Sequence, residues 1–194
     1  MARPAEFDRD QALRDSMMVF WRRGYKAASI KDLTDATRLQ PGSLYGAFRS
    51  KRALFLLALD SYFAEQQTFV TGILQSSNNP PLQRIRLFFD ELLQQSTTDK
   101  ERKGCLLVNT LLETPAKDAE INRRVTRMLL AVEDMLRGVL EEAAADGSLP
   151  PHKQAAILAK VLVNGIFGLR VYSKMHPGAA ELRRTVDGLL SVLE

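Results

Sequence analysis

GYKAASIKDL at residues 24–33 and PGSLYGAFRSK at residues 41–51 decide the fold of this chain. Gly24 can end a helix, because glycine readily adopts the positive φ values that close helices. Ser29, with an acidic residue three positions later, can cap the start of the next helix. Pro41 suits the first turn of a further helix, where its missing N–H would have no partner. The stretch therefore predicts two short helices joined by a turn, which is the layout of a helix-turn-helix.

The second of these helices, expected from Pro41 to about Phe48, has an apolar side and a polar side. Leu44 and Phe48 are four residues apart and should face inward, which leaves the polar residues on the outer surface. Lys51 opens the following helix, where a cation beside free backbone N–H groups favours a bound phosphate. Polar and small residues on such a surface suit contact with phosphates and base edges. We predict DNA contacts from these residues: Ser29, Lys31, Gln40, Pro41, Gly42, Ser43, Tyr45, Arg49 and Lys51.

The net positive charge of the chain lies in its first third. Residues 1–60 contain 11 Lys and Arg against 7 Asp and Glu, whereas residues 61–194 contain 16 of each, so the net charge of +4 falls entirely in the first segment. A basic module on a neutral body is typical of proteins that bind duplex nucleic acid. Ordinary variation of surface charge is the alternative, and the caps, the turn and Tyr45 favour the first interpretation.

Three patterns follow one another in this region: Gly-aromatic, Ser-hydrophobe-x-Asp-hydrophobe and Gly-x-Leu-Tyr-x-x-Phe-x-Ser-Lys. With them, residues 8–60 resemble the N-terminal DNA-binding domain of TetR-type transcriptional repressors. Arg38 stands where that family usually has a turn glycine, so a left-handed residue there would have to carry a side chain. Gln40 replaces the usual serine cap, so the start of the following helix should depend on Pro41. Ala47 replaces a frequent His or Tyr, which removes one potential contact with DNA.

The rest of the chain is helical by its pattern of apolar residues, which recur at spacings of three and four without any alternating strand pattern. We predict an all-α protein with a three-helix helix-turn-helix domain at residues 1–50. A helical bundle at residues 51–194 would bind a ligand and form a dimer. About nine helices are expected, at 8–23, 29–37, 41–48, 51–76, 80–97, 103–112, 116–145, 151–175 and 178–193.

The last two expected helices have apolar faces that include small residues, and such faces pack closely against other helices. A dimer suits DNA reading, because a short recognition helix reads few base pairs and a palindromic operator has two-fold symmetry. The resemblance implies the same dimer, formed by four helices, and completion of the monomer core is the alternative. The residues concerned are Ala155, Ala159, Leu162, Gly165, Ile166, Gly168, Leu169, Leu182, Val186, Leu189, Leu190 and Leu193.

The segment at residues 103–113 carries a polar line on an apolar helix, because helical spacing places Asn109 and Glu113 on the same face as Cys105. A few polar groups among apolar side chains are typical of a small-molecule pocket, and a packed core is the alternative. The Gly-Cys-Leu-Leu run also resembles a subgroup of TetR-type regulators in which a cysteine senses electrophiles or oxidants; a small buried side chain is the alternative. The predicted ligand-binding residues are Phe63, Phe88, Cys105, Asn109, Glu113, Met128 and Phe167.

The sequence contains no motif of an enzyme, a metal site or a cofactor site. His152 and His176 lie beside prolines, and no His-Glu-x-x-His, Gly-x-Ser-x-Gly or glycine-rich phosphate loop occurs. Cys105 is the only cysteine, which excludes an internal disulfide and suits a reducing compartment. No run of about 18 apolar residues and no apolar N-terminal signal core occurs, so we expect a cytoplasmic protein without a membrane partner.

Three functional classes remain after these exclusions. The first is a repressor that binds a palindromic operator as a dimer and is released by a small apolar or electrophilic effector. The second is a constitutive DNA-binding protein without an effector, and the third is a helical interaction protein. The resemblance implies the first class.

Overall fold

The computed structural model describes residues 7–114, 118–175 and 177–194. In these residues it contains nine α-helices and two single-turn 3-10 helices, and no strand, so the predicted all-α fold is confirmed. The α-helices are α1 (Arg9–Arg23), α2 (Ile30–Thr37), α3 (Pro41–Phe48), α4 (Lys51–Leu74), α5 (Pro81–Thr98), α6 (Leu106–Glu113), α7 (Ala119–Ala145), α8 (Ala155–Tyr172) and α9 (Ala179–Leu190), and the 3-10 helices are η1 (Ser173–Met175) and η2 (Ser191–Leu193).

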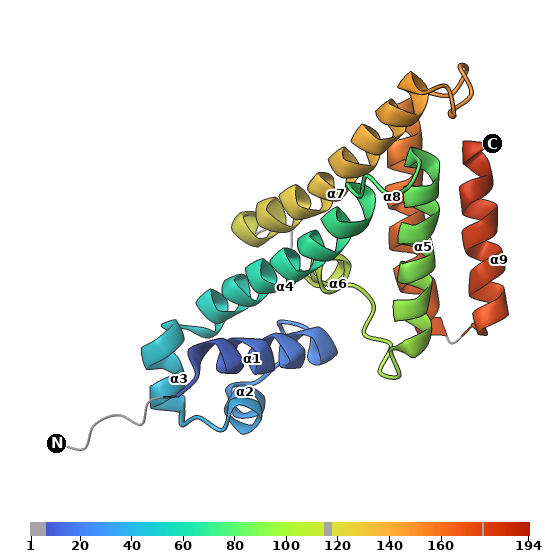
Figure 1. Ribbon diagram of the computed structural model, residues 1–194. Helices are drawn as coiled ribbons and strands as arrows, with labels where there is room; N and C mark the ends of the chain where they lie inside the picture. Colours follow the sequence, from blue (N-terminus) through green and yellow to red (C-terminus); the bar gives the residue numbers. More distant parts are fainter. Residues whose placement is uncertain (1–6, 115–117, 176) are drawn as a thin grey trace.

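The molecule is elongated, with a small module at one end and a helical body at the other (Figure 1). Helices α1, α2 and α3 form the module and pack on one another. Helix α4 leads out of the module and runs beside α7 toward the body. There α5 packs against α7 and α9, and α8 also packs against α7 and α9. The two long helices therefore join the two ends of the molecule.

Local sequence signals set the start and end of the module's helices. The Ser29 hydroxyl accepts the N–H of Asp32 while the Asp32 carboxylate accepts the N–H of Ser29, so the predicted capping box is present. Arg38 ends α2 in the left-handed conformation at φ 58°, as the sequence implied. Gln40 makes no capping hydrogen bond, and the proline at the first position of α3 takes over that role.

Buried side chains form two hydrophobic clusters. The N-terminal cluster joins the module to the first half of α4 (residues 54–62), to α6 and to the first half of α7 (residues 121–129). The C-terminal cluster joins the end of α4 to α5, the second half of α7, α8 and α9. Phe167 of α8 packs against both clusters. The N-terminal cluster therefore crosses the predicted domain boundary at residue 50.

Two helix starts differ from the predicted ones. Helix α6 begins at Leu106 instead of 103, because Arg102 and Gly104 adopt positive φ values of 50° and 70° that break a helix. Helix α8 begins at Ala155 instead of 151, because the preceding residues form a turn in which the Lys153 N–H bonds to the Pro150 carbonyl. The predicted signals at residues 1–6, the helix start at 116 and His176 lie outside the described residues.

Helix α8 and its 3-10 extension, Ala155–Met175, are long and apolar enough by length and composition to cross a membrane, and a third of this segment is buried. Such a helix is weak evidence of a membrane span, because core helices of soluble proteins pass the same test. Six of its exposed positions repeat at spacings of four and three along one side, which is the pattern of a helix-packing stripe. We call them the α8 stripe: Ile157, Val161, Asn164, Gly168, Val171 and Met175.

The predicted seam between two subunits needs correction, because most of its residues complete the monomer core. Of the twelve predicted residues, Ala159, Leu162, Ile166, Leu169, Leu182, Val186, Leu190 and Leu193 are buried within one chain. Gly165 lies against Leu189, and a Cβ atom at Gly165 would collide with the leucine side chain. Only Gly168 of the predicted set belongs to the α8 stripe.

Candidate nucleic-acid interface and ligand cavity

The outer surface of α3 is polar and exposed, as the sequence predicted. Leu44 and Phe48 are buried in the N-terminal cluster and fix the inner side of the helix. Tyr45 is 40% exposed although it is a large aromatic residue, so its ring and hydroxyl are available to a partner. The other predicted contact residues on and next to this helix are also exposed: Gln40, Pro41, Gly42, Ser43 and Arg49.

Two glycines make part of this surface bare. A Cβ atom added to Gly42 or Gly46 would meet no atom within 4 Å, and neither residue has a positive φ. Packing inside the chain therefore gives no reason for glycine at either position. A glycine inside a helix lowers the stability of the helix by about 1 kcal/mol relative to alanine. Since packing does not explain this loss, we interpret the missing side chains as room for the close approach of an outside partner.

The remaining predicted contact residues have partners inside the chain. Lys31 forms an ion pair with Asp35 across one helical turn, and the Ser29 hydroxyl is part of the capping box. The Lys51 ammonium lies 4.9 Å from the centre of the Tyr25 ring, with a long hydrogen bond of 3.4 Å to a backbone carbonyl. None of the described carboxylates forms an ion pair with Lys51, so its charge is available at the edge of the α3 surface.

Arg52, the neighbouring cation, connects α4 to the start of α7. Its guanidinium bonds to Asp118 at 3.0 Å and to Glu120 at 2.7 Å. The hydrogen bond from Arg52 lowers the pKa of the Asp118 carboxyl below its usual value. Arg52 thus has a structural role, whereas Lys51 is the cation that faces away from carboxylates.

Glu113, at the end of α6, holds the turn after α1. Its carboxylate accepts the backbone N–H of Tyr25 at 2.8 Å and the N–H of Lys26. Gly24 adopts φ 80° in this turn, and a Cβ there would collide with the carboxylate. We call this contact the Glu113 latch. No sequence pattern predicts this contact, because the partners are 88 and 87 residues apart in the chain.

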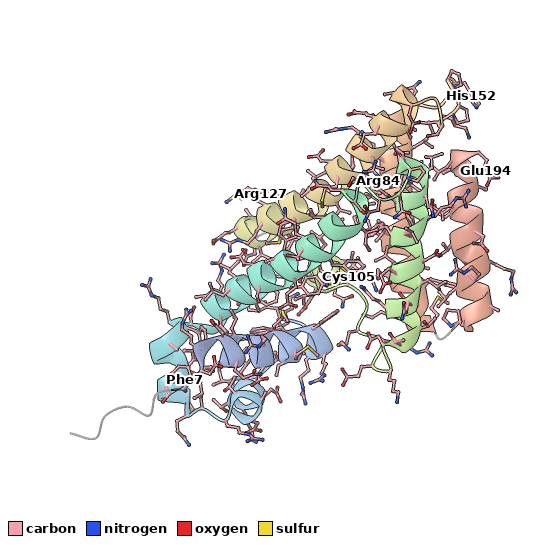
Figure 2. All side chains as sticks on the ribbon, viewed as in Figure 1. Phe7, Arg84, Cys105, Arg127, His152 and Glu194 are labelled. Atoms are coloured by element: carbon pink, nitrogen blue, oxygen red, sulfur yellow. The ribbon has the colours of Figure 1, made fainter. Side chains whose placement is uncertain are left out.

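An apolar cavity of about 60 Å³ lies where the two clusters meet, with walls from α4, α5, α6, α7 and α8. Four of the predicted ligand residues line it: Phe63, Phe88, Cys105 and Phe167. The Tyr62 hydroxyl lies 3.6 Å from the Cys105 sulfur, and burial raises the pKa of this tyrosine well above its ordinary value. Figure 2 shows Cys105 near the middle of the molecule, beside α4.

The structure does not bring Asn109, Glu113 and Met128 to this cavity, so the predicted polar line does not enter it. Asn109 donates to the Lys103 carbonyl and accepts from Lys174, and it thereby fixes the connection before α6. Glu113 forms the latch, and Met128 is buried in the N-terminal cluster beside a separate surface groove. Cys105 is the N-cap of α6 instead of an interior residue, because the helix begins three residues later than expected.

Two family models match the chain. The model for bacterial regulatory proteins of the tetR family matches residues 12–58, and the model for the tetracyclin repressor-like C-terminal domain matches residues 81–189, more than half of the chain. The chain belongs to the TetR family. It is therefore a DNA-binding regulator of transcription with an N-terminal helix-turn-helix, and the exposed surface of α3 lies within the first of these matches.

Curated HTH-type transcriptional regulators match over most of their length. The chain is 28% identical over 172 residues to the HTH-type transcriptional repressor ComR of Escherichia coli strain K12, which is 89% of this chain and 82% of ComR. It is 29% identical over 195 residues to the HTH-type transcriptional regulator YezE of Bacillus subtilis strain 168, over the full length of both.

Solved structures of transcriptional regulators share this fold over nearly the whole chain. A cysteine mutant of the TetR-family regulator CifR, complexed with 26-base-pair operator DNA, superposes with a TM-score of 0.89 at 29% identity over 100% of both chains. The reduced form of Escherichia coli NemR gives a TM-score of 0.84 at 22% identity, over 93% of this chain and 94% of NemR. The second likeness shows the fold alone.

The cavity of this TetR-family chain also has lining residues that the sequence analysis missed. They include polar side chains of α4 and α8. Their spacing does not predict a pocket, because these two helices are apolar on several sides and the polar residues lie next to core positions. These residues are Tyr62, Gln66, Gln67 and Arg170. Among the described residues, no group of three or more His, Cys, Asp and Glu could hold a metal ion, and His152 lies at the far end of the body from the module (Figure 2).

Proposed function

We propose that this chain is a dimeric repressor that binds a palindromic operator and is released by a small apolar or electrophilic effector. Residues 1–50 act as the DNA-binding domain and residues 51–194 as the domain for the effector and the dimer. Regulation of transcription in the cytoplasm, where bacterial DNA lies, is its activity, and no catalytic step is part of the proposal.

The bare, exposed surface of α3 is the observation that carries the DNA part of the proposal. Gly42 allows the backbone to pass close to base edges, with Gln40 and Ser43 beside it as hydrogen-bonding groups. The Tyr45 hydroxyl and the Lys51 ammonium bind phosphates at its border. Pro41, Arg49, Ser29 and Lys31 complete the contact, the last by opening its ion pair with Asp35.

The α8 stripe supports the dimer. Ile157, Val161 and Val171 are 54%, 37% and 44% exposed, an unusual state for branched apolar residues in one row. A second copy of α8, aided by α9, covers this row in a four-helix contact. Two-fold symmetry then places the two α3 helices about one DNA turn, or roughly 34 Å, apart.

The position of the cavity supports control by an effector. Its walls come from both hydrophobic clusters, so a molecule that enters it changes how the clusters fit together. Helix α4 carries Phe63 at the cavity and Lys51 at the module. A tilt of α4 changes the spacing between the two α3 helices of a dimer, and an effector that binds the tilted form better releases the operator.

The DNA part is tested by fluorescence anisotropy of the full chain on the DNA upstream of its own gene. Tyr45→Phe removes one hydroxyl and is expected to weaken binding about fivefold to tenfold, in line with one lost hydrogen bond. Arg86→Ala, at the opposite end of the molecule in an exposed ion pair with Glu194, is the control and leaves affinity unchanged. Equal affinity of Tyr45→Phe and the wild type for this DNA would show that the Tyr45 hydroxyl does not contact DNA.

Cys105→Ser separates the two kinds of effector. A reversible apolar effector still releases the operator from this variant, whereas a covalent electrophile no longer does. If neither electrophiles nor a panel of apolar compounds changes operator affinity of the wild type, the constitutive DNA-binding protein becomes the better description.

A further inference from the structure

A polar groove of about 630 Å³ lies between the helix-turn-helix module and the body. Its walls come from α1, α4, α5, the connection between α5 and α6, and α8. Trp21 and Tyr62 meet edge to face on one wall, with ring centres 4.9 Å apart. The groove lies apart from the α3 surface and from the α8 stripe, so neither DNA binding nor the dimer accounts for it.

The groove and the apolar cavity share part of their walls. Tyr62 and Gln66 of α4 and Arg170 of α8 line both. The cavity itself is almost entirely apolar on its other sides, where Phe63, Phe88 and Phe167 lie. A molecule that spans this boundary would therefore have a polar end in the groove and an apolar end in the cavity.

Arg170 is the charged group at this boundary. One guanidinium nitrogen donates to the Ser96 hydroxyl at 3.3 Å and another donates to the Gln95 side-chain oxygen at 2.7 Å. Both acceptors are neutral, and Arg170 forms no ion pair with any of the described carboxylates. A guanidinium has five N–H donors, so three remain for a ligand, in a planar arrangement that suits a carboxylate.

The acidic residues of the groove already have cationic partners. Asp99 bonds to Lys103 at 2.6 Å, and Glu101 bonds to Arg22 at 2.9 Å and to Lys103 at 3.2 Å. Lys100 and Arg170 add two further positive charges to the lining. The groove therefore has an excess of positive charge, which attracts an anion.

We propose that the groove and the cavity together bind an aliphatic carboxylate, with the carboxylate group on Arg170 and the alkyl chain between Phe63, Phe88 and Phe167. The inference rests on the proposed function in one respect: this ligand is the effector. A purely apolar effector would leave the Arg170 charge and the 630 Å³ groove without a use, and it would have only the small cavity to fill.

The size of the cavity limits the alkyl chain. Its volume of about 60 Å³ is well below the roughly 150 Å³ of an apolar cavity that holds benzene. We expect the affinity of straight-chain carboxylates to rise about fourfold with each methylene group until the cavity is full, as transfer of one methylene from water predicts. Beyond that length the affinity stays constant or falls, because further carbons must displace packed side chains.

The experiment is calorimetric titration of the full chain with butanoate, hexanoate and octanoate, and with the alcohols of the same chain lengths. The wild type is expected to bind hexanoate at least about tenfold more tightly than 1-hexanol, as a charge-assisted bond to arginine implies. Arg170→Gln abolishes this preference and leaves hexanol binding unchanged. Arg170→Lys keeps part of it, and Arg137→Gln on the outer side of α7 keeps all of it.

Two results would overturn the inference: equal affinity of the wild type for hexanoate and hexanol, or an undiminished preference in Arg170→Gln. Unchanged hexanol binding shows that the Arg170→Gln variant is folded. If that variant loses hexanol binding as well, the inference is judged by two other measurements: the preference of the wild type for hexanoate over hexanol, and the part of this preference that Arg170→Lys keeps.

Operator anisotropy in the same solutions separates this inference from the proposed function. Hexanoate that binds and releases the operator supports both. Hexanoate that binds without release supports the ligand site and contradicts its role as effector. Release by an electrophile or a neutral compound, with no binding of carboxylates, supports the proposed function and overturns the inference.

Discussion

The two hydrophobic clusters of this TetR-family regulator differ in what they hold together. The N-terminal cluster fixes the DNA-reading module to α6 and to the first half of α7, whereas the C-terminal cluster packs α5, α8 and α9 and carries the α8 stripe on its outer side. One cluster therefore positions the α3 surface, and the other carries the surface that we propose for the dimer. Only α4, α7 and Phe167 belong to both, and the cavity lies between them.

In the proposed mechanism, the molecule bends at the boundary between the two clusters and both cores stay intact. Each cluster is packed within itself, and the boundary between them is interrupted by the cavity. A ligand at the boundary can alter the angle between module and body while both cores stay intact, because packed units move as rigid bodies. Variants of the α8 stripe test the outer face of the C-terminal cluster, and variants of Glu113 test the attachment of the N-terminal cluster. Variants of Lys51 and Asp118 test charged groups on the surface.

The largest effect is expected from placing charge on the α8 stripe. Val161→Arg with Val171→Arg puts unpaired cations in a dimer seam, and two-fold symmetry doubles the effect. We expect monomers by sedimentation velocity and a loss of operator affinity of at least about 100-fold, equivalent to roughly 2.7 kcal/mol. The melting temperature of the monomer should stay near that of the wild-type fold, because both residues are exposed within one chain.

Leu189→Arg is the matched contrast, because Leu189 packs on Gly165 inside the C-terminal cluster. This variant is expected to lower the melting temperature as well as the dimer content. A dimer that survives both charges on the α8 stripe would place the subunit contact elsewhere on the body.

The second effect concerns the Glu113 latch, which attaches the module to α6. Glu113→Gln leaves a neutral acceptor that can satisfy only one of the two backbone N–H groups well. We expect about tenfold faster hydrogen exchange at the amides of Tyr25 and Lys26, since a bond to a charged acceptor contributes about 1.5–3 kcal/mol. Release of the operator by effector should become less complete, and Glu141→Gln on the exposed side of α7 is the control.

Unchanged exchange at those two amides would mean that the latch is open in solution. In that case the attachment of the module rests on the apolar contacts of the N-terminal cluster and on the hydrogen bond from the Trp21 ring nitrogen to the Gly104 carbonyl at 3.1 Å.

A smaller effect is expected from Lys51→Ala at the border of the α3 surface. Loss of one phosphate contact weakens binding to all DNA sequences alike and reduces the slope of log affinity against log salt by about 1 per subunit. The slope is measured by anisotropy between low and moderate salt. Lys160→Ala, on an exposed position of α8, should leave the slope unchanged; the same slope in both variants would place Lys51 away from DNA.

The smallest effect is a change in acid stability at Asp118. Because Arg52 lowers the pKa of this carboxyl in the folded state, its contribution is present above the ordinary value of 3.8 and is lost as pH falls below it. Asp118→Asn keeps a good helix cap and removes the charge. The drop in melting temperature from pH 5 to pH 3 should therefore be smaller in the variant, and an equal drop would show that the pair contributes nothing measurable.

The sequence predicted those parts of the molecule that depend on neighbouring residues. The capping box of Ser29 and Asp32, the left-handed Arg38 and the outward position of Tyr45 all follow from side chains within a few positions of one another. Helix periodicity likewise located the described helices, with the largest errors at the starts of α6 and α8, which local turns displace by three and four residues.

The parts that depend on distant residues were not predictable in this way. Asn109 and Glu113 were expected in a pocket because they share a face with Cys105. Their hydrogen-bond partners lie instead in the turn after α1, in the connection before α6 and in η1, and these partners determine the direction of both side chains. Helix α8 is apolar on nearly every side, so periodicity could not separate its core face from the α8 stripe. Arg170 gave no signal at all, because a lone cation near a helix end is ordinary.

The Glu113 latch has a consequence for the exchange of parts between relatives. Its carboxylate accepts two backbone N–H groups and lies where a Cβ atom at Gly24 would stand, so these contacts involve the backbone of the turn and no side chain of α3. A foreign helix-turn-helix that keeps this glycine and the apolar residues of the N-terminal cluster should therefore dock on this body whatever operator it reads. The same body could then report one chemical signal through many promoters, as a sensor designer would want, because the glutamate stays in the body and only the module is exchanged.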